Sequence, residues 1–181
     1  MTYTSESTAL DREVLALIER WHRGGAPVDE RDFEDLALRI LAHQLRYNDA
    51  YARYAGTFGY SAASLPTSWH DIPAVPAAAY KEATLATFDP SRAALAFETS
   101  GTTQGAGGRH YMETRSLYDA SLLAGFDRFM LPDGARLRYL NLVPNPALRP
   151  QSSLGYMMAR VSADRGDGNT GWYLRDEDIF V

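Results

Sequence analysis

A short apolar segment that runs directly into a glycine- and hydroxyl-rich stretch constrains the fold most strongly. Residues 94–97 predict a buried strand, and residues 98–110 that follow contain four glycines and four serine or threonine side chains. In open α/β sheets, ligand-binding loops leave the carboxyl ends of strands in this way. We therefore predict an α/β fold in which this loop leaves a central strand of a mixed sheet.

The rest of the chain supplies helices to cover such a sheet. Apolar residues recur every three or four positions in several segments, which indicates amphipathic helices. The predicted helices are 8–22, 32–54, 77–85, 114–130 and 153–161, and a second strand is predicted over 137–143. We expect one domain, residues 1–181, with a helical start over 8–56 and a sheet and phosphate-loop region over 65–181. Gln44 and Asn48 fall on the apolar side of the second helix, where they need polar partners.

Composition limits the function. The chain has 181 residues, 45% of them apolar and 23% charged, which is ordinary for a globular domain. The net charge is −5, and Lys81 is the single lysine, so nucleic acid is not expected as a partner. No apolar run approaches the roughly 20 residues that cross a bilayer, so no membrane partner is expected. The chain has no cysteine, and we expect a soluble, cytoplasmic protein.

The glycine-rich stretch has the chemistry of a phosphate loop. Glycines let the backbone approach an anion, and successive N–H groups form a concave nest for phosphate oxygens. Hydroxyl groups add donors or magnesium ligands. Neither the Walker pattern nor a GxGxxG turn is present. From the residues alone, a phosphate loop and a plain polar surface loop both remain open.

At this point the chain resembles a family. Residues 99–103 are similar to the TSGTT core of the phosphate loop in adenylate-forming enzymes, and the wider context resembles the LuxE-type acyl-protein synthetases of bacterial bioluminescence. The matching stretches keep the same order and cover roughly residues 32–161. They are the helix with Gln44, Asn48 and Tyr51, then Ile72–Pro76 with Tyr80-Lys81-Glu82, then Phe97–Thr103, and finally Leu142–Pro144 with Ser152–Met157.

This resemblance implies ATP- and Mg²⁺-dependent activation of a carboxylic acid, fatty or aromatic, as an acyl-adenylate. The acyl group then passes to a thiol acceptor on a carrier protein, coenzyme A or a protein cysteine. The residues that would wrap the ATP phosphates are Thr99, Ser100, Gly101, Thr102, Thr103 and Gly105. Arg109 and His110 would contact a phosphate or the carboxylate, or they simply begin the next strand. Ser152, Ser153 and Tyr156 would line the acyl pocket, although Ser152 is equally suited to cap a helix.

Two features depart from the family pattern. Gln104 stands where the common loop has glycine, and family members are markedly longer than this chain. Their later adenine- and ribose-binding motifs, catalytic lysine and acceptor cysteine have no counterpart here. We therefore expect a truncated ligase, or one half of a split enzyme, that is inactive without its missing half. No catalytic residue and no resident metal site are assigned. The alternative is a non-catalytic nucleotide- or partner-binding module with a degenerate adenylating fold.

Overall fold

A computed structural model describes residues 5–99, 107–175 and 178–179. In this part of the chain the helices are α1 (Ser5–His22), α2 (Glu30–Tyr47), α3 (Asp49–Gly56), α4 (Ala79–Glu82), α5 (Ser116–Met130) and α6 (Ser153–Arg165). The strands are β1 (Leu95–Glu98), β2 (Arg109–Met112), β3 (Leu140–Asn141), β4 (Gly171–Trp172), β5 (Leu174–Arg175) and β6 (Asp178–Ile179). The mixed helix and strand content confirms an α/β class at this level.

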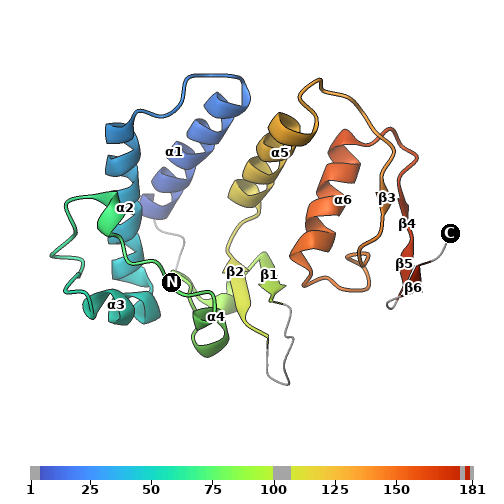
Figure 1. Cartoon of the computed structure of the whole chain (residues 1–181). Helices are drawn as coiled ribbons and strands as arrows, with labels where there is room; N and C mark the ends of the chain where they lie inside the picture. The colour runs from blue at the N-terminus through green and yellow to red at the C-terminus, as the bar shows by residue number, and fades with distance from the viewer. Residues whose placement is uncertain (1–4, 100–106, 176–177, 180–181) are drawn as a thin grey trace.

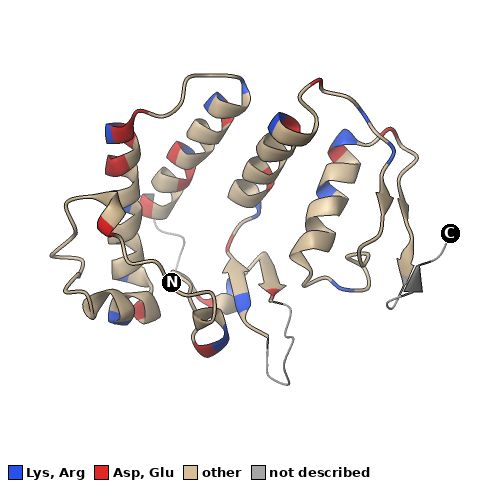
Figure 2. Ribbon diagram, in the orientation of Figure 1, with Lys and Arg blue, Asp and Glu red and all other residues tan. Residues whose placement is uncertain are grey.

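Four helices lie side by side in the order α2, α1, α5 and α6 (Figure 1). Helix α1 packs against both α2 and α5, and α5 packs against α6. The β1–β2 hairpin lies at one end of α5, and β3 runs beside α6 (Figure 1). Within the described residues, no helix is long and apolar enough to cross a bilayer. Figure 2 shows the Lys and Arg residues dispersed over several elements, with Asp and Glu residues among them.

The strands pair differently from the expected sheet. The described strands form three separate pairs: β1–β2 and β5–β6 are antiparallel, and β3–β4 is parallel. Strand β1 thus pairs with β2 and is not the centre of a larger sheet in this part of the chain. Of the strand predicted over 137–143, two residues form β3, and Leu140 and Leu142 are 59% and 56% exposed. A run of apolar residues predicts burial, but here no described element covers that side of the strand.

The predicted helix over 32–54 is divided at Asn48. The backbone there is extended (φ −116°, ψ 90°), and its N–H ends α2 by donating to the Gln44 carbonyl at 2.9 Å. Its side-chain oxygen accepts from the Tyr51 N–H at 3.1 Å and so begins α3. The Asn48 amide also donates to the Gln44 side chain at 3.1 Å. The expectation that Gln44 and Asn48 need partners is confirmed.

The core around α2 and α3 positions the segment that leads to α4. Leu41, Leu45, Tyr51 and Ala55 form a buried cluster. The hydroxyl of Tyr51 donates to the Pro73 carbonyl at 3.1 Å, and that of Tyr54 donates to the Ala74 carbonyl at 2.9 Å. These bonds attach the extended proline-containing segment to α3, and α4 then lies against β2.

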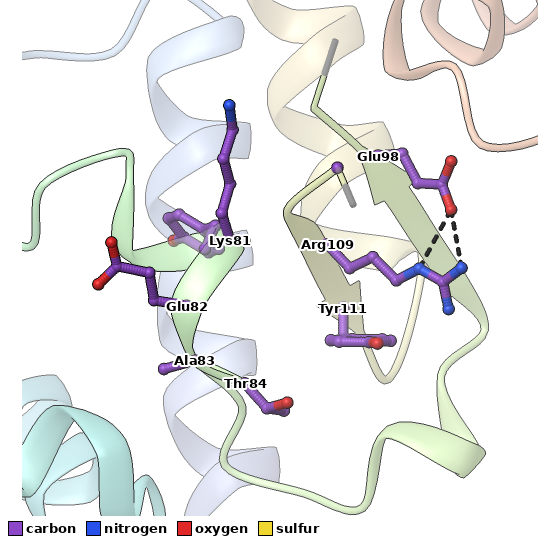
Figure 3. Close-up of a pocket in the computed structure, with 9 residues that line it drawn as sticks. Lys81, Glu82, Ala83, Thr84, Glu98, Arg109 and Tyr111 are labelled. Carbon is purple, nitrogen blue, oxygen red and sulfur yellow. Dashed lines mark hydrogen bonds and ion pairs between the residues drawn. The ribbon is translucent and has the colours of Figure 1, made fainter. Parts of the chain in front are cut away.

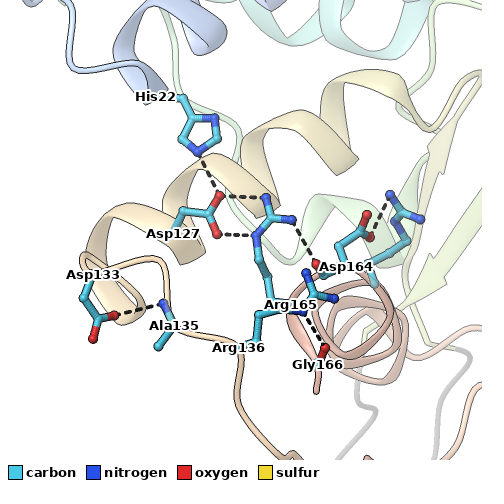
Figure 4. Close-up of polar contacts among 9 residues, drawn as sticks. His22, Asp127, Asp133, Ala135, Arg136, Asp164, Arg165 and Gly166 are labelled. Carbon is cyan, nitrogen blue, oxygen red and sulfur yellow. Dashed lines mark hydrogen bonds and ion pairs between the residues drawn. The ribbon is translucent and has the colours of Figure 1, made fainter. Parts of the chain in front are cut away.

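A group of three polar side chains connects helices α1, α5 and α6 near their C-terminal ends. Asp127 of α5 accepts two hydrogen bonds from Arg165 of α6, from Nε at 2.6 Å and from Nη2 at 2.7 Å. His22, the last residue of α1, lies 2.8 Å from the same carboxylate (Figure 4). Hydrogen bonding to Arg165 is the main reason that the pKa of Asp127 lies below its usual range, and the contact with His22 adds to it.

Candidate functional site

The glycine-rich stretch joins β1 to β2, and the two ends of this connection are hydrogen-bonded to each other. The Thr99 N–H donates to the Gly108 carbonyl at 2.8 Å, and the Gly108 N–H donates to the Thr99 hydroxyl at 2.9 Å. Thr99 therefore has a structural contact at the start of the loop. The other predicted phosphate-loop residues, Ser100, Gly101, Thr102, Thr103 and Gly105, lie outside the described residues.

Two glycines at the end of this stretch permit close packing. A Cβ atom at Gly108 would lie 2.7 Å from the carbonyl carbon and oxygen of Tyr80, and one at Gly107 would lie 2.9 Å from the Thr99 carbonyl oxygen. Gly108 is buried between β2 and α4. These contacts with backbone atoms leave no room for a side chain, so both positions require glycine. The missing Cβ atom of Gly108 lets α4 lie against the base of the loop, and that of Gly107 lets the two ends of the connection approach each other.

An open cleft of about 510 Å³ lies between α4 and the β1–β2 hairpin. Its polar wall includes Lys81, Glu82 and Thr84 on one side and Glu98, Arg109 and Tyr111 on the other (Figure 3). Gly107 also lines it, so the cleft reaches the end of the glycine-rich connection. The cleft therefore combines cationic, acidic and hydroxyl groups beside the predicted phosphate loop.

Arg109 is held in this cleft by its cross-strand neighbour. It lies opposite Glu98 in the β1–β2 ladder, and its Nε and Nη2 atoms lie 3.1 and 2.9 Å from the same Glu98 oxygen. Hydrogen bonding to Tyr111 and to Glu98 raises the pKa of Arg109 above its already high usual value. Arg109 thus carries a fixed positive charge at the cleft.

His110 is the next residue of β2 and has a different environment. Its ring centroid lies 5.3 Å from that of Tyr80. Although the residue is partly exposed, partial removal of its ring from water lowers the pKa of His110, which favours the neutral ring at pH 7. A neutral imidazole can donate or accept a hydrogen bond but adds no positive charge for a phosphate. The sequence left two interpretations of Arg109 and His110 open: contact with the ligand, or the start of the next strand. The structure shows that they are the first two residues of strand β2.

The predicted acyl-pocket residues lie beside the start of the glycine-rich connection. The Glu98 N–H donates to the Gln151 carbonyl at 3.0 Å, which brings the beginning of α6 next to the end of β1. Ser152 is the N-cap of α6, and its hydroxyl accepts from the Gly155 N–H at 3.1 Å. The capping interpretation of Ser152 is confirmed. Ser153 follows it as an exposed residue in the first turn.

Tyr156 belongs to an aromatic cluster under β1. Its ring centroid lies 5.5 Å from that of Phe97 and 5.8 Å from that of Tyr118. The Tyr156 hydroxyl donates to Asp119 at 2.7 Å. Burial, aided by this contact, raises the pKa of Tyr156 to about 12. Its hydroxyl is therefore occupied and stays protonated, and its ring packs against those of Phe97 and Tyr118.

The cleft contains residues that the sequence analysis did not assign to the site. Lys81 and Glu82 come from α4, and Glu98 and Tyr111 come from the hairpin. The sequence did contain an indication of Lys81 and Glu82. Lys81 is the only lysine of the chain, and Tyr80-Lys81-Glu82 is one of the stretches that carry the family resemblance. Within the described residues, no group of three or more histidine or acidic side chains is placed to hold a metal ion.

Comparisons of the chain with known protein families, with characterised proteins and with solved structures find no match.

Proposed function

We propose that this chain binds the phosphates of ATP in the cleft between α4 and the β1–β2 hairpin, as the phosphate-loop part of an adenylate-forming carboxylate ligase. One observation carries the proposal. Strand β1 runs directly into the glycine-rich connection, whose ends meet at Thr99 and Gly108, and the cleft at that junction is lined by Lys81 and Arg109. Guanidinium and ammonium groups beside a glycine-rich loop are a common phosphate-binding arrangement.

The charges of the cleft suit ATP with its metal ion better than free phosphate. Two cations, Lys81 and Arg109, and two carboxylates, Glu82 and Glu98, line the cleft, and Arg109 pairs with Glu98. Mg²⁺ prefers oxygen ligands and is usually held by one or two carboxylates together with substrate phosphates and water. The carboxylates and the Thr84 hydroxyl are donors of that kind, so the residues of the cleft fit a magnesium–ATP complex. Bound Mg²⁺ would neutralise charge that develops on departing pyrophosphate.

In the proposed reaction, an oxygen of the carboxylate attacks the α-phosphorus of ATP and pyrophosphate leaves, which gives an acyl-adenylate. A thiol then attacks the acyl carbon and AMP leaves. Because the 181 residues contain no cysteine, the thiol lies outside them. The family resemblance points to a fatty or aromatic acid. The position of the Tyr156 ring beside Phe97, next to the start of the glycine-rich connection, supports a place for the acid there.

Isothermal calorimetry with ATP and Mg²⁺ tests the binding step. We expect saturable binding that weakens roughly 10- to 100-fold in Lys81→Ala or Arg109→Ala, because each variant removes a charge-assisted contact. Ser100→Ala tests the loop itself and is expected to abolish binding. Arg12→Ala, at an exposed position of α1 outside the cleft, is the control and should bind as the wild type does.

The assignment of the cleft would be refuted if the three cleft and loop variants bound ATP as tightly as the Arg12→Ala control and the wild type. It would also be refuted if the folded wild type bound no ATP. Exchange of labelled pyrophosphate into ATP, with decanoate and benzoate as trial acids, tests the chemical step. Exchange would show that the chain adenylates an acid by itself. Binding of ATP without exchange is expected both of a ligase part that needs its missing half and of a nucleotide-binding module that lacks the reaction.

A further inference from the structure

The ion pair between Glu98 and Arg109 lies inside the cleft that we assign to ATP, so the inference below rests on the proposed function. Glu98 ends β1, Arg109 begins β2, and the two residues lie opposite each other in the hairpin. The Arg109 Nε and Nη2 atoms lie 3.1 and 2.9 Å from the same oxygen, Oε1, of Glu98 (Figure 3). A phosphate that uses these two nitrogens must therefore replace a carboxylate.

The other charged side chains of the cleft differ from this pair. Lys81 and Glu82 also line the cleft, and neither forms an ion pair with another described residue. In Figure 3 the Glu82 side chain points away from Arg109. Glu82 and Glu98 thus carry the same charge in the same cleft, but among the described residues Glu98 alone pairs with Arg109.

The Glu98–Arg109 pair is easily separated. Its side chains are 40% and 57% exposed, and an exposed pair changes an equilibrium constant by about fivefold or less, because water solvates both ions when they part. A phosphate can take the place of Glu98, since a guanidinium binds phosphate and carboxylate in the same bidentate manner. The pair itself is therefore only a weak obstacle to phosphate binding.

Repulsion between the displaced carboxylate and the phosphate is the larger obstacle. Both anions are attracted to one guanidinium, and two like charges about 4 Å apart weaken binding roughly fivefold even at the dielectric constant of water. A divalent cation between them reverses this effect. Mg²⁺ is usually held by one or two carboxylates together with substrate phosphates, so a single carboxylate beside the phosphate chain is a sufficient protein ligand.

We propose that Glu98 makes phosphate binding at Arg109 depend on a divalent cation. Without the cation, Glu98 stays paired with Arg109 and repels the phosphate chain. With the cation, the Glu98 carboxylate becomes a ligand of the metal, and the Arg109 guanidinium is released to the phosphates. Glu98 thus determines the specificity of the cleft, because it favours the metal complex of ATP over the free nucleotide.

Calorimetric titration with ATP, once in excess Mg²⁺ and once in EDTA at equal ionic strength, measures this preference. The ratio of the two dissociation constants reports how much the cation contributes to binding. In the wild type, free ATP should bind roughly tenfold or more weakly than its Mg²⁺ complex. Glu98→Gln should reduce this ratio roughly tenfold, mainly because free ATP binds more tightly once the competing charge is gone.

Two further variants show whether the effect acts through Arg109. Glu82→Gln is the matched control: it removes the same charge from the same cleft, leaves the pair intact, and should change the ratio by about threefold at most. In an Arg109→Ala background, Glu98→Gln should also change the ratio by about threefold at most, because phosphate is no longer attracted to the position beside Glu98. A purely structural role of Glu98 would not produce this dependence on Arg109.

Glu98→Gln should keep the fold. The contact of Glu98 with the start of α6 is made by its backbone N–H, which donates to the Gln151 carbonyl, and its side chain is 40% exposed. The circular dichroism spectrum should be that of the wild type. If this variant does not fold, Glu98→Thr carries the same test with a neutral residue that favours strands.

The proposal is overturned if ATP binds and Glu98→Gln leaves the ratio unchanged, if Glu82→Gln lowers it equally, or if the change persists in the Arg109→Ala background. In these three outcomes ATP still binds, so the proposed function stands. If the folded wild type binds ATP neither with Mg²⁺ nor without it, the proposed function and this inference are both overturned. A reduced ratio in Glu98→Gln that depends on Arg109 supports the inference.

Discussion

Asp127 is the residue at which a single substitution should loosen the packing of three helices. Its carboxylate accepts two hydrogen bonds from Arg165 and contacts His22, so it joins α5 to α6 and to the end of α1 (Figure 4). Asp127→Ala removes all three contacts and leaves the Arg165 guanidinium without its main partner. The fold should persist, because the apolar contacts between these helices remain.

The expected loss follows from the geometry and the burial of the pair. The Asp127 and Arg165 side chains are 19% and 27% exposed, so water screens the pair less than it screens a surface ion pair. Breaking a fully buried pair costs about 3–5 kcal/mol, and exposed pairs contribute about 0.2–1 kcal/mol. The bidentate geometry places Asp127 toward the upper part of this interval. We expect Asp127→Ala to lower the free energy of unfolding by about 2–4 kcal/mol at pH 7.

The effect should depend on pH in a defined direction. The pKa of Asp127 is lower in the folded chain than its usual value, mainly through hydrogen bonding to Arg165. A depressed folded pKa contributes stability that is fully present above the unfolded value of about 3.9 and is lost as the pH falls through the folded pKa. The difference between wild type and Asp127→Ala should therefore be constant near neutrality and shrink below about pH 4.

Urea unfolding followed by circular dichroism at pH 7 and at pH 3 measures both quantities. Glu19→Ala serves as the control, because Glu19 pairs with Arg23 at the surface, where their side chains are 61% and 79% exposed. This control should change stability by at most about 0.5 kcal/mol. An equally small effect for Asp127→Ala at pH 7, or a large effect that does not diminish at pH 3, would contradict the reasoning.

Three further substitutions test local packing. Gly108→Ala forces a Cβ atom against the Tyr80 backbone and should destabilise the chain by about 1–3 kcal/mol and weaken ATP binding; unchanged thermal unfolding would disprove the close contact. Gly125→Ala, inside α5 with open space around its Cβ position, should instead stabilise by about 0.5–1 kcal/mol, and a loss would show that the space is filled. Ser152→Ala removes the N-cap of α6 and should lower the free energy of unfolding by about 1 kcal/mol. Weaker binding of the carboxylic acid without this loss of stability would show instead that the Ser152 hydroxyl contacts the acid.

Local patterns in the sequence predicted most elements because their causes are local. The helix expected over 114–130 is α5, Ser116–Met130, and the helix expected from Ser153 begins at that residue as α6, which extends beyond Val161 to Arg165. The strand expected over 94–97 is β1, Leu95–Glu98. Periodic apolar residues and a capping serine act within one or two turns of chain, so sequence spacing is sufficient to find them.

Predictions that depended on neighbours in space were less successful. The apolar periodicity continues through Asn48, so it could not show that this side chain ends one helix and begins another. The strand expected over 137–143 shortened to β3, because a strand needs a hydrogen-bonded partner along its length and β4 supplies one for two residues. Phosphate binding by the loop hydroxyl groups that follow Thr99 remains a prediction, because residues 100–106 lie outside the described part of the chain.

By itself, the sequence determined most of the helices, the strand that enters the glycine-rich stretch, the absence of a cysteine from these 181 residues and the resemblance on which the proposed reaction rests. The tertiary structure decided which side chains share a site. Lys81 stands 28 positions before Arg109 in the chain, and they line one cleft because Gly108, without a Cβ atom, allows α4 to reach the hairpin. Contacts of this kind depend on packing between distant segments, which spacing along a chain does not encode.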